Sequence, residues 1–296
     1  GPRRWPPCGP AVSRRLLAAS VAGSAALGWA AGKLSALAEV RDLKREQASR
    51  VRWCEAQICR GLGLPTPEQA QRSEAVCLGR ILSDEEIEEV LGFAWLFWNQ
   101  KLPGHGQNDR LLQAQEKGQH WRTSYLHTGG LFAQRFPALH SRLRKAVFEA
   151  DAARWRVLPG RDASRLHFRT IECHEYGPTG QLTGEGHYDA GSLLTLDVML
   201  ADPGADFKGG ELAMPEPSGF MRRLELRKGE AALFLSHKYH NVLPVLEGHR
   251  AVLVLELWDG PPRTCPHRCD SVGPCGRSLD LTLEQLERAG PPPRGS

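Results

Sequence analysis

The sequence predicts a mainly β protein, a sandwich or closed barrel that is braced by helices preceding it in the chain. Between residues 166 and 258 the apolar segments follow one another without a helical pattern, and glycine-rich turns separate them. Successive strands joined by such turns are typical of sandwiches and barrels. Apolar residues recur at helical spacing near residues 83–98 and 131–151, and these stretches predict the bracing helices.

The composition is that of an ordinary globular protein. The chain has 296 residues, of which 41% are hydrophobic and 24% are charged, so it can bury a core without metal or disulfide staples. The net charge of +4 is mild, and no basic run is interleaved with aromatic residues. We therefore expect no nucleic-acid partner.

Residues 1–33 predict a targeting or membrane-anchor segment. Residues 16–32 are uncharged, and Arg14, Arg15 and Lys33 flank them. Such a stretch fits a short membrane anchor, a cleaved signal or transit segment, or a buried alanine-rich helix. The basic flank and the separate amphipathic stretch that follows favour targeting or anchoring. We therefore expect the protein to be located in the secretory pathway, anchored in the membrane of the endoplasmic reticulum or Golgi with most of the chain in the lumen, or in another organelle.

Residues 34–78 predict a helical stalk and a linker. Apolar residues between Leu34 and Ile58 form a stripe with charges between them, and Gly61 and Pro65 end the pattern. The helix could mediate self-association or pack on the domain that follows, so the oligomeric state stays open.

The first bracing helix begins after Ser83. Ser83 can cap the helix, and Glu86 completes a capping box three positions later. A second helix is expected from Leu131 to Asp151, and a strand from Leu166 to Tyr176.

His187 and Asp189 begin the segment that leads to Leu200. In a strand, residues two apart point to the same face, so the two side chains would aim at one point. His240 is the candidate third ligand, with His237 as its nearest rival. Two histidines and one carboxylate with open coordination positions are typical of non-haem Fe(II) oxygenases.

Further motifs follow in a fixed order: a glycine turn at 207–212, a turn and strand at 229–237, the run 240–245, and Arg250, ten residues after His240, opening a strand to Trp258. This ordered set resembles the Fe(II)/2-oxoglutarate-dependent dioxygenases, most closely the branch of prolyl 4-hydroxylases and procollagen lysyl hydroxylases. The resemblance covers residues 165–259 within a domain expected at 79–263. It implies a double-stranded β-helix, a jelly roll whose mouth holds the metal.

The resemblance also implies roles for individual residues. His187, Asp189 and His240 would hold the iron and form the catalytic centre. Arg250 would bind the distal carboxylate of 2-oxoglutarate, because a guanidinium offers two parallel donors to a carboxylate. Tyr176 and Thr195 could donate hydroxyls to the same carboxylate. Many collagen prolyl hydroxylases have lysine at the position of Arg250, whereas lysyl hydroxylases and other prolyl hydroxylases have arginine, which leaves the substrate open.

The activity implied is hydroxylation of a protein or peptide side chain, most simply a prolyl residue. It would consume O2 and decarboxylate 2-oxoglutarate to succinate and CO2, with ascorbate keeping the iron reduced. A lysyl or small-molecule hydroxylase of the same superfamily remains an alternative. A non-catalytic cupin-like binding module and a zinc hydrolase with the same ligands are further alternatives. The complete set of His187, Asp189, His240 and Arg250 favours the enzyme.

The tail, residues 264–296, contains three of the eight cysteines: Cys265, Cys269 and Cys275. They could form a zinc knuckle or disulfides, or be incidental surface thiols. The lack of a paired Cys-x-x-Cys favours incidental thiols over zinc. In an oxidising compartment we expect disulfides within 265–275, or between Cys54, Cys59 and Cys77.

Overall fold

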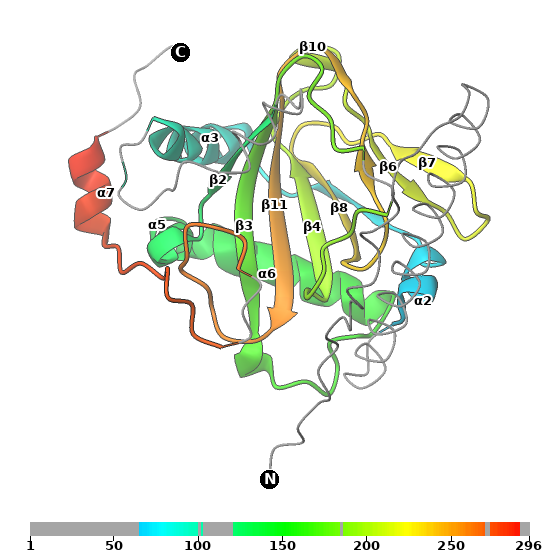
Figure 1. Ribbon diagram of the computed structural model, residues 1–296, viewed down its shortest axis with the longest axis horizontal. Helices are drawn as coiled ribbons and strands as arrows, with labels where there is room; N and C mark the ends of the chain where they lie inside the picture. The colour runs from blue at the N-terminus through cyan, green and yellow to red at the C-terminus, as the bar shows by residue number, and fades with distance from the viewer. Residues whose placement is uncertain (1–64, 100–101, 103–120, 184–185, 270–272, 291–296) are drawn as a thin grey trace, which may run out of the picture. The chain divides into compact units, whose positions relative to one another are not determined.

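The computed structural model describes residues 65–99, 102, 121–183, 186–269 and 273–290 (Figure 1). The chain forms two compact units, Gly1–Pro67 and Glu68–Ser296, and nearly all described residues belong to the second. The predicted anchor at 16–32 and most of the predicted stalk lie outside the described residues. Within the described ranges, no helix has the length and apolar character needed to cross a membrane.

The second unit begins before the predicted boundary at residue 79 and extends through the tail. Its helices are α2 (Pro67–Gln71, shared with the end of the first unit), α3 (Asp84–Trp98), α5 (Leu131–Arg135), α6 (Pro137–Ala153) and α7 (Leu283–Ala289), with 3-10 turns at Thr128–Gly130 and Ala163–Arg165. Its strands are β1 (Val76–Arg80), β2 (Trp121–Tyr125), β3 (Leu166–Tyr176), β4 (Leu194–Met199), β5 (Phe207–Gly209), β6 (Leu212–Pro215), β7 (Met221–Leu224), β8 (Glu230–Leu235), β9 (Asn241–Val242), β10 (Val245–Gly248) and β11 (Arg250–Asp259).

The strands form one large sheet and two small ones. The large sheet has the order β1-β8-β4-β11-β3-β2, and its neighbours are antiparallel. The small sheets are β10-β5 and β7-β6-β9. Between β3, β4, β8 and β11 the chain leaves the large sheet and returns to it, which is why strands distant in sequence pair in its centre. This order confirms the predicted jelly roll, a double-stranded β-helix.

The bracing helices follow the sequence with one correction. At the start of α3, Ser83 Oγ accepts from the Glu86 amide at 3.2 Å and the Glu86 carboxylate accepts from the Ser83 amide at 3.0 Å, so the capping box is confirmed. The second predicted helix is divided into α5 and α6, because Phe136 has non-helical dihedral angles and Pro137 starts α6. Proline lacks an amide proton and is favoured at a first helical position.

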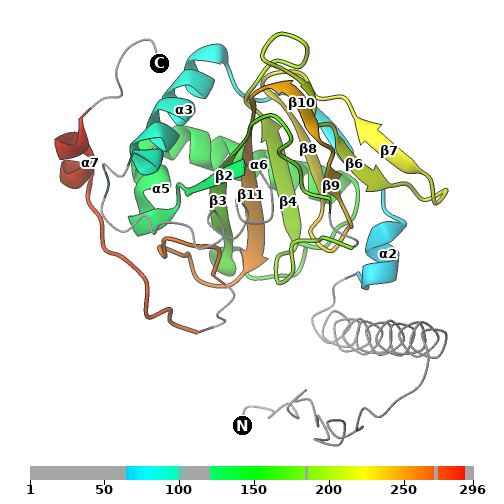
Figure 2. The ribbon, with the colours of Figure 1, turned by 45° about the horizontal axis from the view of Figure 1, so that its top comes forward.

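The central strands of the large sheet, β3, β4, β8 and β11, are buried on both faces. Helix α6 lies across its strands (Figures 1 and 2), where the His140 ring packs on Phe168 with centroids 5.4 Å apart. Leu253 and Leu255 of β11 are fully buried, whereas their neighbours Val254 and Glu256 line a cavity. Strand side chains alternate between faces, so the sheet has one apolar face and one face that carries the polar site.

Candidate active site

The candidate active site is a cavity of about 370 Å³ against the large sheet. Alternate residues of β2, β3, β4 and β11 line it, as the period of a strand requires. The loop before β4 and the segment after β8 add the three predicted metal ligands. The lining from these strands consists of Trp121, Thr123, Tyr125, Glu172, His174, Tyr176, Thr195, Asp197, Arg250, Val252, Val254 and Glu256.

The structure brings His187, Asp189 and His240 together. The two carboxylate oxygens of Asp189 lie 3.8 Å from His187 Nε2 and 3.9 Å from His240 Nε2. One ligand atom from each residue lies within 4.8 Å of the others. These spacings are too long for direct hydrogen bonds and leave room for one ion between the atoms. Asp189 and His240 are buried and His187 is half-buried, so one side of the group stays accessible.

The reason for this convergence differs from the one the sequence suggested. His187 and Asp189 do not lie in a strand, since β4 begins only at Leu194. They lie in the preceding loop, which is tied to the segment after β8. The Asp189 amide donates to Ser236 O at 2.8 Å, and the His240 amide donates to His187 O at 3.0 Å. The three ligands therefore meet through hydrogen bonds between two loops, and the expected alternation is not the cause.

Lys238 fixes the segment that carries His240. Lys238 is fully buried, and its ammonium donates to the carbonyls of Gln71 and Ser73 at 3.0 and 2.7 Å. The Lys238 carbonyl in turn lies 3.1 Å from His240 Nδ1. A proton on Nδ1 satisfies that contact and leaves Nε2 as the metal-binding nitrogen. The rival His237 packs its ring against Tyr188, with centroids 5.7 Å apart, and is not in the ligand group.

Burial keeps His187 neutral. Loss of water contact, and next the proximity of His240, lowers the pKa of His187 to about 4. A neutral imidazole is the form that binds a metal, because a protonated ring has no free lone pair.

Thr195 has a different partner from the one expected. Its hydroxyl donates to Asp189 Oδ2 at 2.7 Å and lies 2.9 Å from the Ser236 hydroxyl. It thus orients the carboxylate, and the predicted bond to 2-oxoglutarate stays a prediction. Hydrogen bonds of this kind hold a metal ligand in its binding geometry.

Replacing Thr195 by valine is expected to weaken iron binding by about 10- to 100-fold, because the Asp189 carboxylate loses its orienting donor. Competition with a chelator of known affinity measures this. Thr195→Ser keeps the hydroxyl and should restore most of the affinity. Equal affinity in Thr195→Val and wild type would remove Thr195 from the support of the metal site.

Arg250 is the most unusual group in the cavity. Its side chain is fully buried, and none of its three guanidinium nitrogens has a hydrogen-bond partner among the described residues. The Tyr176 ring faces it, with the guanidinium carbon 5.3 Å from the ring centroid. Tyr176 itself is buried, which raises the pKa of its hydroxyl. A buried cation without a partner is costly, so the cavity is suited to an anionic ligand.

Asp197 does not neutralise Arg250. No ion pair joins the two among the described residues, and Asp197 Oδ1 also has no hydrogen-bond partner there. Burial raises the pKa of Asp197, against the opposing effect of Arg250. Gly210, in the turn before β6, lies close to the arginine. Its φ of 68° favours glycine, and a Cβ there would lie 3.0 Å from Arg250 Cδ.

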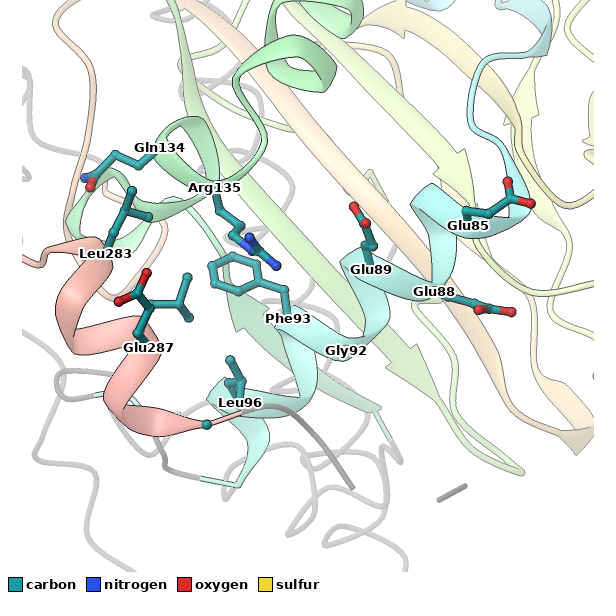
Figure 3. A pocket seen from close by; sticks show the side chains of 12 residues that line it. Glu85, Glu88, Glu89, Gly92, Phe93, Leu96, Gln134, Arg135, Leu283 and Glu287 are labelled. Carbon is teal, nitrogen blue, oxygen red and sulfur yellow. The ribbon is translucent and has the colours of Figure 1, made fainter. Parts of the chain in front are cut away.

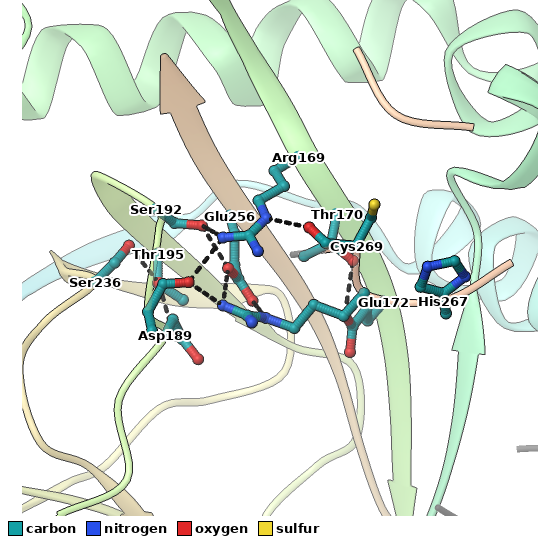
Figure 4. A network of polar contacts seen from close by, with 12 residues as sticks. Arg169, Thr170, Glu172, Asp189, Ser192, Thr195, Ser236, Glu256, His267 and Cys269 are labelled. Atoms are coloured by element: carbon teal, nitrogen blue, oxygen red, sulfur yellow. Dashed lines mark hydrogen bonds and ion pairs between the residues drawn. The ribbon is translucent and has the colours of Figure 1, made fainter. Parts of the chain in front are cut away.

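A polar network that the sequence reasoning missed supports the wall beside Asp189 (Figure 4). Glu256 is buried and accepts from Ser192 at 2.5 Å and from Arg268 at 2.6 Å. Burial, and next the charge of Asp189, raises the pKa of Glu256 to about 7, which Arg268 opposes. Arg268 also donates to Ala190 O, next to Asp189. The signal that could have found this network is a carboxylate inside the otherwise apolar strand at 251–258.

Gly191 lets a second arginine join this network. Arg169 donates to Cys269 O at 2.8 Å and to Ala190 O at 2.7 Å. A Cβ on Gly191, whose φ is 85°, would lie 2.4 Å from the Arg169 guanidinium. Glycine is therefore required two residues after Asp189 for this close approach.

Arg268→Met is expected to lower the free energy of unfolding by about 3–5 kcal/mol, the usual cost of leaving a buried charge without its partner. Chemical denaturation measures this. Arg288→Met is the matched control, because its pair with Glu284 is exposed and should be worth less than about 1 kcal/mol. The double variant Arg268→Met, Glu256→Met should regain much of the loss. If Arg268→Met is as stable as the control Arg288→Met, the ion pair between Arg268 and Glu256 has no structural role.

A second cavity, of about 740 Å³, lies between α3 and α7 (Figure 3). It is lined by Glu88 and Glu89 of α3, by Glu287 of α7, and by Arg135, which lies beside the Phe93 ring. Neither metal-ligating group found among the described residues belongs to it. The cavity on the large sheet is therefore the candidate active site.

No protein-family profile and no curated protein matches the sequence. Solved structures are similar in fold. A viral collagen prolyl hydroxylase from Paramecium bursaria Chlorella virus-1, in complex with 2-oxoglutarate, is 17% identical over 62% of this chain and 94% of its own, with a TM-score of 0.42. A prolyl hydroxylase from Trichoplax adhaerens, in complex with a peptide fragment of hypoxia inducible factor, is 17% identical over 70% and 93%, with a TM-score of 0.45. The α-ketoglutarate-dependent epimerase SnoN of nogalamycin biosynthesis is 17% identical over 72% and 93%, with a TM-score of 0.42. At such identities and scores, the strand order of this chain identifies its double-stranded β-helix, and its function must be argued from its own residues.

Proposed function

We propose that the chain is an Fe(II)- and 2-oxoglutarate-dependent dioxygenase that hydroxylates a side chain of a protein or peptide, most simply a prolyl residue. The proposal is carried by the buried guanidinium of Arg250, which lines the same cavity as the three ligands and has no hydrogen-bond partner among the described residues. A metal-binding protein without a carboxylate cosubstrate has no need of such a cation. A dicarboxylic keto acid would supply one end to the metal and the other to Arg250.

The donor set fits iron. Two neutral imidazoles and one carboxylate on one side leave positions open, which suits Fe(II) enzymes that bind a cosubstrate and O2. When bound, the iron supplies the oxidative chemistry in which O2 converts 2-oxoglutarate to succinate and CO2 and adds one oxygen atom to a C–H bond of the substrate. His187, Asp189 and His240 hold the ion, and Thr195 keeps the Asp189 carboxylate oriented.

The other residues bind and orient. The Arg250 fork matches a carboxylate with two parallel donors, and its charge is permanent. The valines of β11 and the ring of Tyr176 exclude water around that pair, which strengthens it. Because the distal carboxylate is fixed at Arg250, the keto acid would meet the metal in one orientation, which is the contribution of positioning to the rate.

Aromatic rings near the accessible side of the triad support a prolyl substrate. Tyr188, next to His187, lines the cavity, and its ring lies 5.8 Å from that of Tyr239. Trp121 of β2 also lines the cavity. Proline-containing segments dock in grooves lined by aromatic rings, because the rigid proline ring loses little entropy on packing.

We also propose that ascorbate is the reductant that keeps the iron in its Fe(II) form. A further proposal is that residues 16–32 anchor the protein in a membrane of the secretory pathway.

The experiment is incubation of the purified chain with Fe(II), 2-oxoglutarate, ascorbate and defined peptides, read by peptide mass. Matched peptides carry proline, lysine or alanine at one position in the same host sequence. The proposal predicts one added oxygen in the proline peptide, with the alanine peptide unchanged. Tyr188→Ala should lower turnover of the peptide while the weak succinate formation without peptide persists.

Oxygen on the lysine peptide alone would replace the prolyl assignment and retain the reaction. Succinate that no peptide stimulates would contradict the peptide substrate and favour a small molecule. Tight binding of 2-oxoglutarate without any succinate would favour the binding-module alternative.

A further inference from the structure

A second group of metal-ligating side chains lies in the tail. Cys265, His267, Cys269 and Cys275 each offer one ligand atom, and these four atoms all lie within 4.8 Å of one another. All three cysteines are in the thiol form, and Cys265 and Cys269 are buried at 0% and 1% exposure. The Cys275 sulfur lies 3.7 Å from His267 Nε2. The group shares no residue with the candidate active site.

The segment that carries this group has no regular secondary structure of its own in its described residues. Between the end of β11 and the start of α7, the described residues form no helix or strand. The sequence from Cys265 to Cys275 has proline, glycine and charged residues and only one aliphatic side chain, that of Val272. An irregular segment of this composition cannot fold by burying apolar surface, and small modules of this kind are commonly folded by a metal.

We propose that Cys265, His267, Cys269 and Cys275 bind one structural zinc ion. Three thiolates and one imidazole form a closed tetrahedral set, which is the arrangement of structural zinc sites, without the open position that catalytic sites keep. A disulfide explains the geometry less well. One bond between two of the cysteines would leave the third thiol and His267 converging on it without a role.

The zinc site explains how the tail reaches the active site. Arg268 stands between the ligands His267 and Cys269, and it pairs with the buried Glu256. The backbone of both ligands is also held from the core: His127 Nε2 lies 3.3 Å from His267 O, and Arg169 donates to Cys269 O (Figure 4). Fixing the two ligands fixes the base of Arg268, so the ion positions a residue of the cavity wall. This site does not depend on the reaction proposed above.

The test is the metal content and the metal environment of the full chain, purified with any histidine tag removed. The variant with both His187→Ala and Asp189→Ala has no ligand pair at the triad, so zinc in that variant must lie elsewhere. We expect about one zinc ion per chain to remain in it. X-ray absorption should show three sulfur atoms at roughly 2.3 Å and one nitrogen at roughly 2.0–2.1 Å.

Single substitutions then assign the ligands. Cys275→Ser and His267→Ala should each lose the zinc, and Cys77→Ser, an exposed thiol of β1, should retain it. Because a zinc-free variant could fail to fold, the absorption spectrum of the triad variant tests the proposal without changing the tail. Zinc well below one per chain there, fewer than three sulfur ligands, or a disulfide among the tail cysteines in unreduced protein would overturn it.

Discussion

Asp189→Ala is expected to abolish both hydroxylation and iron binding. Asp189 is the one carboxylate of the ligand group, and both of its oxygens face histidine nitrogens at 3.8 and 3.9 Å. Removing this carboxylate should lower the iron affinity by more than the 10- to 100-fold, roughly, that is lost when only a hydrogen-bond partner of a metal ligand is removed. Iron per chain after dialysis, and product formed with saturating 2-oxoglutarate, measure the two effects.

Asp280→Ala is the control for this variant, because Asp280 is exposed and belongs to neither metal-ligating group. It should keep wild-type iron content and turnover. Asp189→Ala should still unfold cooperatively, because β4 and β8 remain paired through their backbones. Full turnover in Asp189→Ala would place the metal site elsewhere.

Arg250→Gln is expected to raise the KM for 2-oxoglutarate by about 30-fold or more, because losing one member of a buried charged pair costs about 2–5 kcal/mol. Iron content should stay at the wild-type level, since Arg250 is not a ligand. Initial rates over a range of 2-oxoglutarate concentrations measure the effect. Arg250→Lys keeps the charge without the two parallel donors, so its KM should lie between those of Arg250→Gln and wild type.

The stability of the same variants separates binding from structure. Without ligand, Arg250→Gln should be at least as stable as wild type, because a buried guanidinium without hydrogen-bond partners is costly to fold. Adding 2-oxoglutarate with iron should raise the Tm of wild type and have little effect on Arg250→Gln. An unchanged KM together with a lowered Tm would make Arg250 a structural residue.

The sequence predicted a sandwich or closed barrel because apolar strand segments and glycine-rich turns are local signals, and the resemblance to a known family implied the jelly roll. It also indicated which histidines and which aspartate to compare, because their order along the chain resembles that of a known family. The sequence did not indicate how Asp189 comes to lie close to His240. That depends on backbone hydrogen bonds from Asp189 to Ser236 and from His240 to His187, which join segments far apart in the sequence.

The contacts that the sequence missed are those between distant segments. Glu256 and Arg268 look unrelated until β11 and the tail fold together, and their pairing then defines one wall of the cavity. The spacing of the tail cysteines favoured incidental thiols, because the usual pair of closely spaced cysteines is absent. His267 completes the set from within the segment, and only the fold shows that Cys275 returns to it.

The release of CO2 from 2-oxoglutarate labelled at its 1-carboxylate tests the central claim most directly, since it requires both the metal and the cosubstrate in one cavity. We would load the wild-type chain with Fe(II), confirm the iron content, and compare it with Asp189→Ala and Arg250→Gln at limiting 2-oxoglutarate. The account predicts labelled CO2 in step with succinate from wild type and little from either variant. The account would be contradicted if iron-loaded wild-type protein released no labelled CO2 in the presence of the proline peptide.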